Sequence, residues 1–544
     1  MKSFKACIRT IRQLSRPVQW RVLITIVLGA ASTALSLLFV HYSKLLVDLA
    51  TGKADSPLFP SAWIFLSVLL MQIAVMLFSN WWNSYNQVKT QNILRLNLFG
   101  HVLKSRWDGR ERFLSGDTVN RLEEDIRVVS ELICERIPGL IVSIIQLLAA
   151  SAYLLLLAPN LLWVLIILMA AAVLGSKMFF RQFRELMAKI RARESELQQL
   201  MQESLQHRVL VLTLTRIDRV LQKFGALQVD VEDNTRKRLN YNAIARGFMF
   251  LGFQAGHAAA FLWGVFGIRA GTVTFGDMTA FLQLVGRVQR PIADFGRLVP
   301  AFIQALTSVE RLMELEELEQ EPLQNAIMLP GAPEILVSRV RYTYPGGDTP
   351  VLNDFSCRFE AGRFSAIAGP TGIGKSTLIR LILGLLKPEE GSVTIGGVPA
   401  GSALRGNFMY IPQGNTLLSG TIRTNLQLAA PNATEEQIRE ALDTAMAQFV
   451  YSLPKGLDTP CGEIGSGLSE GQAQRIAIAR ALLRPGGVLI LDESTSALDP
   501  DTENKLLQNL NERYHGRKTI LFISHRESVS QSADAIVTLE QTTY

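Results

Sequence analysis

Long stretches without a charged residue constrain the fold of this chain most, and all of them lie in its first 310 positions. They are Val22–Ser43, Ala62–Val88, Ile137–Ser176 and Gly247–Ile268. A helix crosses a bilayer with about 20 mostly apolar residues. The third stretch is about twice that length and is interrupted near Pro159, so it predicts two helices joined by a turn. These stretches therefore predict five membrane-spanning helices.

Composition and charge fit a membrane protein. Apolar residues make up 48% of the 544 positions and charged residues only 19%, below the roughly 25% of soluble domains. The net charge is +7, and the basic residues gather beside the apolar stretches, as they do at the cytoplasmic ends of membrane helices. This placement favours the lipid bilayer as a partner and argues against nucleic acid.

A phosphate-binding motif, GPTGIGKST, follows a short apolar strand and precedes a helix-favouring stretch. In this context the glycines turn backbone N–H groups onto phosphate oxygens, and the helix start adds its positive dipole end. Lys375 places a charge on the β and γ phosphates, and Ser376 can bind Mg²⁺. We predict ATP and Mg²⁺ as cofactors, held by Gly369, Gly372, Gly374, Lys375, Ser376 and Thr377.

A second motif, VLILDE, ends in two carboxylates at Asp492 and Glu493. Four apolar residues predict a buried strand that brings these groups to the edge of a sheet. Asp492 is the predicted Mg²⁺ ligand, and Glu493 is placed to act as general base on the attacking water. Together the two motifs predict an α/β P-loop NTPase domain.

Topology then predicts a sixth span that hydropathy alone leaves out. The basic N-terminus lies inside, and an ATPase domain must also lie inside, so the number of spans is even. Residues 277–306 supply the sixth span although they carry several charges. We predict a membrane domain over 1–315, a linker over 316–333 and a nucleotide-binding domain over 334–544. The six predicted spans are 22–43, 62–86, 137–157, 161–178, 247–268 and 277–306.

The segment LSEGQ, from Leu468 to Gln472, resembles the signature motif of ATP-binding-cassette (ABC) transporters. The resemblance covers nearly the whole chain, and the order of membrane domain before cassette is similar to the exporter type. It implies a six-helix exporter fold and two cassettes facing head to tail. Each signature then contacts ATP held by the other copy, through Leu468, Ser469, Gly471 and Gln472.

The resemblance also implies roles for four further residues. Tyr344 is similar to the aromatic residue that stacks on adenine, and Gln413 to the glutamine that senses Mg²⁺ and the attacking water. Asp499 is similar to the residue of the loop that crosses the dimer interface. His525 is similar to the histidine that bonds the γ-phosphate. The predicted catalytic residues are Glu493, His525 and Gln413, and the predicted metal ligands are Ser376, Gln413 and Asp492.

Because one cassette cannot close on itself, the resemblance implies a half-transporter that pairs with a second copy or a related chain. The predicted function is ATP-driven export of a hydrophobic, amphipathic or peptide-like substrate across the cytoplasmic membrane. An importer on the same fold and an ATP-gated channel or regulator are the alternatives. Transport direction and ion conductance would separate them.

A polar stripe within the sixth predicted span indicates a substrate cavity. At 100° per residue its members fall within about 80° of helix surface. Charged groups within a span usually face a water-filled path or a partner. We therefore predict a cavity that binds an anionic cargo, and the alternative is that Asp294 pairs with an arginine at the wet end of the span. The stripe consists of Gln283, Arg287, Arg290, Asp294 and Arg297.

Overall fold

The structure, a computed structural model, describes residues 4–107, 116–178, 180–322, 325–414, 416–461, 467–523 and 532–540. The chain divides into two compact units. One, the membrane unit, consists of Met1–Phe99 and Asp117–Glu316, and the other, the cassette unit, consists of Gly100–Gly116 and Glu317–Tyr544.

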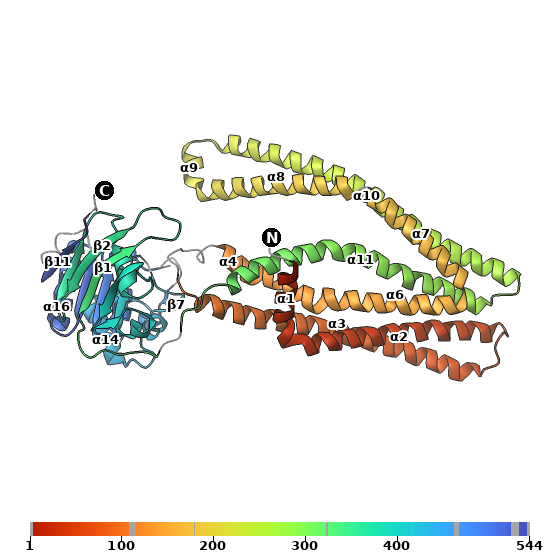
Figure 1. The fold of residues 1–544 in the computed structure, drawn as a ribbon, viewed down its shortest axis with the longest axis horizontal. Helices are drawn as coiled ribbons and strands as arrows, with labels where there is room; N and C mark the ends of the chain where they lie inside the picture. The colour runs from red at the N-terminus through yellow and green to blue at the C-terminus, as the bar shows by residue number, and fades with distance from the viewer. Residues whose placement is uncertain are drawn as a thin grey trace. The chain divides into compact units, whose positions relative to one another are not determined.

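The membrane unit is helical (Figure 1). Two π-helical turns, Arg121–Asp125 and Leu132–Arg136, separate its shorter helices before α6. Its helices are α1 (Phe4–Ser15), α2 (Gln19–Ala50), α3 (Leu58–Leu103), α4 (Gly116–Asn120), α5 (Ile126–Glu131), α6 (Ile137–Leu157), α7 (Pro159–Lys177), α8 (Phe180–Gln206), α9 (Arg208–Thr213), α10 (Ile217–Arg269) and α11 (Phe275–Glu316).

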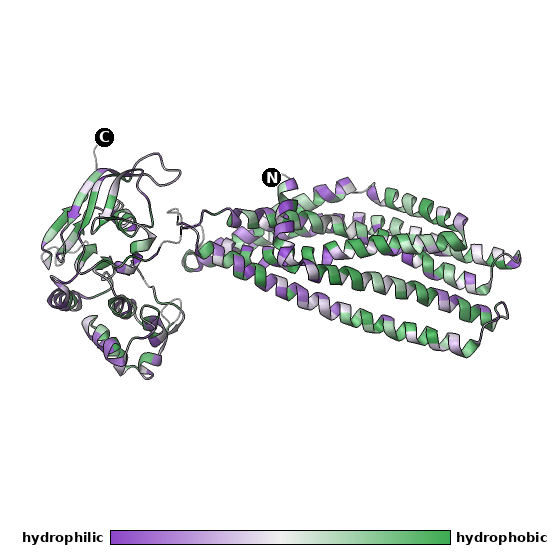
Figure 2. Ribbon diagram, turned by 60° about the horizontal axis from the view of Figure 1, so that its bottom comes forward, coloured by the Kyte–Doolittle hydropathy of each residue, from purple (hydrophilic) through white to green (hydrophobic). Residues whose placement is uncertain are grey.

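Among the described residues, five helical segments are long and apolar enough to cross a membrane. They contain α2, α3, α6, α7 and α10. Large apolar side chains on them point outward, such as Leu77 at 61% and Ile167 at 67% exposure, and Figure 2 shows apolar residues along most of the unit. In a soluble protein such a surface would favour aggregation, whereas lipid covers it in a membrane.

Helix α11 is 42 residues long but interrupts its apolar surface with charges. It packs against α2, α6 and α10. A buried cluster that includes Val40, Leu154, Phe281 and Leu284 lies between these helices. α11 therefore packs within the helical bundle although it carries charged residues.

Helix α10 packs against α7 and α8, and these three helices form the antiparallel arm seen in yellow and green in Figure 1. Small residues permit the close approach, since a Cβ added at Gly252 would lie 2.4 Å from Cβ of Ala172. Any larger residue at position 252 would push the two helices apart.

The cassette unit contains a parallel sheet in the order β11-β3-β10-β9-β6 and an antiparallel sheet in the order β2-β1-β4-β5. Every residue of β9 and β10 is buried, as expected for parallel strands covered by helices on both faces. The strands are β1 (Ile335–Tyr342), β2 (Leu352–Phe359), β3 (Phe364–Ala368), β4 (Glu390–Ile395), β5 (Val398–Pro399), β6 (Phe408–Ile411), β7 (Gly420–Thr421), β8 (Pro460–Cys461), β9 (Val488–Asp492), β10 (Thr519–Ile523) and β11 (Ala535–Thr538).

Helices follow the strands and cover the sheets. The ones used below are α12 (Lys375–Ile382), which follows β3, α15 (Glu470–Leu482), which precedes β9, and α16 (Pro500–Tyr514), which follows β9. Because the strands are parallel, the residues that follow β3, β6 and β9 leave the sheet at the same edge. This edge is where the sequence predicts the nucleotide.

The start of the predicted linker pairs with the end of the α3 segment. Residues 104–106 run antiparallel to residues 319–321, with backbone bonds from Arg106 N to Glu319 O (2.7 Å) and from Glu321 N to Lys104 O (3.0 Å). The carboxylate of Glu321 accepts two bonds from the guanidinium of Arg405, at 2.5 and 2.6 Å. The linker is therefore held to the cassette by a bidentate ion pair.

Candidate nucleotide site and membrane cavity

The phosphate loop lies between buried β3 and α12. Gly369, Gly372 and Gly374 have φ of 149°, 83° and 111°, which other residues rarely adopt. A Cβ at Gly374 would also lie 2.9 Å from Cγ1 of Val351. These glycines therefore let the backbone curl around a space into which its N–H groups can point.

Lys375 begins α12 and is only 5% exposed. Its Nζ donates to the carbonyl oxygens of Gly369 (2.7 Å) and Pro370 (3.0 Å). Burial lowers the pKa of Lys375, and the nearby carboxylates of Glu493 and Asp492 act in the opposite direction. The ammonium group is thus held against the backbone of the loop.

Two of the three predicted Mg²⁺ ligands, Ser376 and Asp492, lie together. Ser376 Oγ donates to Oδ1 of Asp492 at 3.4 Å, although 116 residues separate them in sequence. The hydroxyl of Tyr410 donates to the other carboxylate oxygen at 3.3 Å. Asp492 is 4% exposed, and burial raises its pKa. A buried carboxylate beside a hydroxyl, with only neutral donors bonded to it here, suits a hard divalent cation.

Glu493 and Gln413 are also in contact. Gln413 Nε2 donates to Oε2 of Glu493 at 2.7 Å. Glu493 has a φ of 48°, which is unusual for a residue with a side chain and costs about 1–3 kcal/mol. Strain of this kind concentrates at functional sites. The turn after β9 thus holds the carboxylate of Glu493 beside the amide of Gln413.

Tyr344, the predicted adenine-stacking residue, lies beside α12. Its hydroxyl is 3.1 Å from Oγ1 of Thr377 and accepts a bond of 3.0 Å from Arg380. Tyr342 contacts its ring edge-on, with 5.1 Å between ring centroids. Tyr344 and Thr377 therefore belong to one hydrogen-bonded group with the phosphate-loop helix.

The signature residues form a second group at the start of α15. Ser469 is its N-cap and accepts from Gln472 N at 3.2 Å, while the side chain of Gln472 accepts from Ser469 N at 2.9 Å. This capping box leaves the exposed helix end free to attract an anion. A Cβ at Gly471 would lie 2.8 Å from the carbonyl oxygen of Ala497. Leu468 packs against the adjacent apolar core.

The segment that carries Asp499 is connected to this second group. Asp499 caps α16 by accepting from Thr502 N at 3.0 Å. Its pKa is lowered, mainly by that backbone bond. Gln474 of α15 bonds Ser496 (3.4 Å) and the backbone of Ala497 (3.3 Å) in the preceding turn. His525 lies outside the described residues.

Two residues that contribute to the nucleotide site were not predicted. Tyr410 carries a bond to Asp492, and Arg380 bonds Tyr344 and lies over the ring of Trp107 at 4.9 Å. Tyr410 occurs in the YIPQ segment three positions before Gln413. Its position near the end of that strand could have indicated that it lies close to the site. Arg380 has no such signal, because its contacts depend on the packing of α12.

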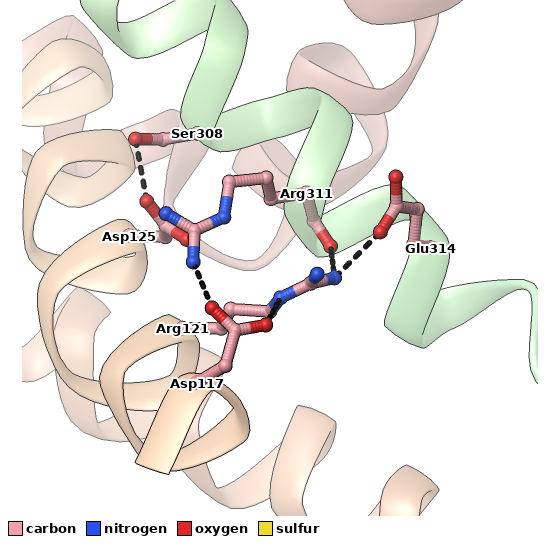
Figure 3. Close-up of polar contacts among 6 residues, drawn as sticks. All are labelled: Asp117, Arg121, Asp125, Ser308, Arg311 and Glu314. Carbon is pink, nitrogen blue, oxygen red and sulfur yellow. Dashed lines mark hydrogen bonds and ion pairs between the residues drawn. The ribbon is translucent and has the colours of Figure 1, made fainter. Parts of the chain in front are cut away.

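In the membrane unit a charged network joins the C-terminal end of α11 to the segment before α6 (Figure 3). Arg121 bonds Asp117 at 2.8 Å and Glu314 at 2.6 Å. Arg311 bonds Asp117 at 2.6 Å and lies 3.3 Å from Asp125. Ser308 donates to Asp125 at 2.8 Å. We call these residues the charged network: Asp117, Arg121, Asp125, Ser308, Arg311 and Glu314.

The polar stripe of α11 lies nearer the N-terminal end of the same helix than the charged network does. Gln283 Nε2 donates to Ser43 Oγ of α2 at 3.1 Å. Arg287 and Arg290 line a cavity of about 310 Å³. Among the described side chains no ion pair involves Asp294. The side chain of Arg297 lies outside the described part.

Fold and site together define a membrane protein whose helical unit is attached to a phosphate-loop ATPase, that is, an ATPase coupled to transport. Family models agree: residues 22–292 match the ABC transporter transmembrane region, and residues 352–496 match the ABC transporter ATPase domain. The chain belongs to the ABC transporter family.

Relatives support the family over most of the chain. An uncharacterized ABC transporter ATP-binding protein, y4gM, of Sinorhizobium fredii is 31% identical over 81% of this chain and 77% of the relative. The ATP-dependent lipid A-core flippase of Desulfotalea psychrophila is 28% identical over 82% and 79%. The structure of a bacterial Atm1-family ABC exporter with ATP bound matches 97% of this chain and 94% of that one. Its TM-score is 0.77 at 24% identity, so this likeness shows the exporter-type fold.

Proposed function

We propose that two copies of the chain, or this chain and a related half-transporter, form a dimer that exports a hydrophobic, amphipathic or peptide-like substrate. The six predicted spans lie in the cytoplasmic membrane and the cassette in the cytoplasm. One observation supports the proposal most. The contacts Ser376–Asp492 and Gln413–Glu493 bring predicted metal ligands and predicted general base to one edge of the parallel sheet.

Each residue of this edge has a role in hydrolysis under the proposal. Lys375 and the loop N–H groups bind the β and γ phosphates. Ser376 and Asp492 hold Mg²⁺, which when bound supplies positive charge to the phosphate oxygens. Glu493 accepts the proton of the attacking water, and the 2.7 Å bond from Gln413 orients its carboxylate. His525 bonds the γ-phosphate, and the ring of Tyr344 stacks on adenine.

The dimer is proposed because the cassette has two anion-binding helix ends, which lie on different helices. The phosphate loop precedes α12, whereas Ser469 caps α15 and is linked through Gln474 to the turn before Asp499. As the resemblance to ABC transporters implies, one ATP contacts both kinds of end, and Ser469 and Gly471 of the second copy complete the site. Asp499 then lies at the interface between the two cassettes.

Transport by purified protein in lipid vesicles tests this proposal. With cassettes facing outward, ATP and Mg²⁺ should drive a fluorescent amphiphile into the vesicle lumen. Glu493→Gln should lower ATP hydrolysis by about 100-fold or more, because the general base is lost, and should abolish accumulation. Glu512→Gln, an exposed change on α16, is the matched control and should leave both rates unchanged.

Other outcomes would overturn the proposal. ATP-dependent loss of amphiphile from the lumen would indicate import instead of export. Conductance of ions without amphiphile accumulation would indicate a channel. Full hydrolysis by the Glu493→Gln variant would exclude the assigned general base.

A further inference from the structure

A polar cavity lies in the membrane unit among α2, α3, α6 and α11. Its volume is about 310 Å³, near the lower limit of about 300 Å³ for ligand pockets. All four helices contribute residues from the middle of their predicted spans. The polar lining side chains include Ser32 and Thr33 of α2, Gln72 and Asn80 of α3, Gln146 of α6, and Arg287 and Arg290 of α11.

The two arginines in this cavity are not neutralised by the protein. No acidic residue is among the described residues that line it. Within the part of the chain that the structure describes, neither Arg287 nor Arg290 forms an ion pair or a hydrogen bond. Asp294 lies one turn away from Arg290 and forms no ion pair with it.

An unpaired cation near the bilayer centre is unfavourable by several kcal/mol. Two of them on adjacent turns of one helix also repel each other. Proteins keep such groups where they face water, a partner or a ligand. The lining supplies what an anion needs besides charge, because hydroxyl and amide groups from three other helices can bond its oxygens.

We propose that this cavity binds the acidic group, a phosphate or a carboxylate, of an amphipathic cargo. Arg287 and Arg290 oppose its charge, and the hydroxyl and amide groups of α2, α3 and α6 donate the remaining hydrogen bonds to its oxygens. The volume admits a head group and leaves the apolar part of the cargo outside. This inference rests on the proposed function, since it names the substrate class of the same exporter.

Packing keeps the cavity from collapsing onto the arginines. A Cβ at Gly29 would lie 2.3 Å from Cγ2 of Val142, so α2 and α6 are already in closest contact at one wall. The bond from Thr33 Oγ1 to the carbonyl oxygen of Gly29 (3.0 Å) fixes that hydroxyl against its own helix. Ser32 and Gln146 stay available to a ligand at the same level.

Equilibrium binding without ATP tests the cavity. Purified full-length protein in a zwitterionic detergent is titrated with fluorescent lysophosphatidic acid and with a monoacylglycerol of the same chain. We expect the acidic probe to bind at least about tenfold more tightly, and the double change Arg287→Gln, Arg290→Gln to remove that difference. Arg287→Lys with Arg290→Lys keeps the charges and should retain most of the preference.

Arg246→Gln is the matched control, because Arg246 is an exposed arginine of α10 outside the cavity. It should leave both probes unchanged. Inorganic phosphate is added as a competitor to separate the sources of the anion. Competition at millimolar phosphate assigns the cavity to a free anion, competition by the acidic amphiphile alone assigns it to a head group, and either result supports an anion site.

Equal binding of the acidic probe by the unchanged protein and by the double Gln variant would overturn the inference. So would equal affinity of the unchanged protein for the two probes, a measurement that needs no variant to fold. ATP hydrolysis by the same preparations distinguishes a failure of the cavity inference from a failure of the proposed function. Normal hydrolysis with no acidic preference contradicts only the cavity, whereas absent hydrolysis in the unchanged protein contradicts the proposed function.

Discussion

Two arginines of α11 are in opposite situations. Arg311, near the C-terminal end, contacts the carboxylates of Asp117 and Asp125 (Figure 3). Arg287, 24 positions (311 − 287) earlier, faces a polar cavity in which none of the described residues is acidic. Charges that the protein itself opposes hold two segments together, whereas charges left unopposed are available to a ligand. The same helix therefore combines a structural contact with a candidate binding surface.

The same contrast occurs among carboxylates, with the sign reversed. Asp125 of the charged network accepts from Ser308 and is opposed by Arg311. Asp492 of the cassette accepts from two neutral hydroxyl groups, those of Ser376 and Tyr410. Burial raises the pKa of both carboxyl groups. The charge of Asp125 is thus opposed within the protein, whereas Asp492 has capacity for a cation.

Replacing Arg311 and Arg287 by the same residue should have different effects on stability. Arg311→Gln leaves Asp125, which is 4% exposed, without its cation and should lower the free energy of unfolding by about 1–3 kcal/mol. Arg287→Gln removes an unpaired charge and should leave stability unchanged or slightly higher. Thermal unfolding in detergent, with fixed lipid, measures both. Equal losses of unfolding free energy in the two variants would contradict the proposed difference between Arg311 and Arg287.

Tyr410→Phe should have a smaller effect, which is limited to Mg²⁺ binding and its pH dependence. The bond from Tyr410 lowers the pKa of Asp492, opposing burial, so its loss raises that pKa further. A proton and Mg²⁺ compete for this carboxylate. The acid limb of ATP hydrolysis should therefore move to higher pH, and the Mg²⁺ requirement should rise by about two- to tenfold near neutral pH.

The matched control for this change is Tyr451→Phe, which alters a tyrosine of the cassette that is 47% exposed. It should leave the pH profile and the Mg²⁺ requirement unchanged. An acid limb that stays in place in the Tyr410→Phe variant, at limiting Mg²⁺, would show that Asp492 does not hold the metal.

The sequence predicts the nucleotide site better than the membrane site. Ser376, Gln413 and Glu493 follow apolar strands of a parallel sheet, so their meeting at one edge follows from the fold class. The partner of Asp125 does not, because Ser308 lies 183 residues away on α11 and no local pattern encodes that contact. The charged residues of α11 could be identified from the sequence. Whether an acidic residue lies opposite each arginine depends on how four helices pack.

Hydropathy likewise identifies five helices and leaves out α11, as the sequence indicated. The physical reason is the helix's position: it packs on α2, α6 and α10, so part of its surface contacts protein and a polar cavity instead of lipid. A composition rule that assumes lipid on all sides underestimates such a helix.

Hydrolysis by a mixed dimer tests the central claim, that each ATP is held between two copies. One copy carries Lys375→Ala and the other Ser469→Asp, which keeps a helix cap but places a carboxylate against the γ-phosphate. ATP hydrolysis by each variant alone should fall by about 100-fold. Mixed dimers, purified through two different tags, contain one intact site and should hydrolyse ATP at about half of the normal rate. Mixed dimers no more active than either variant alone would contradict a site shared between copies.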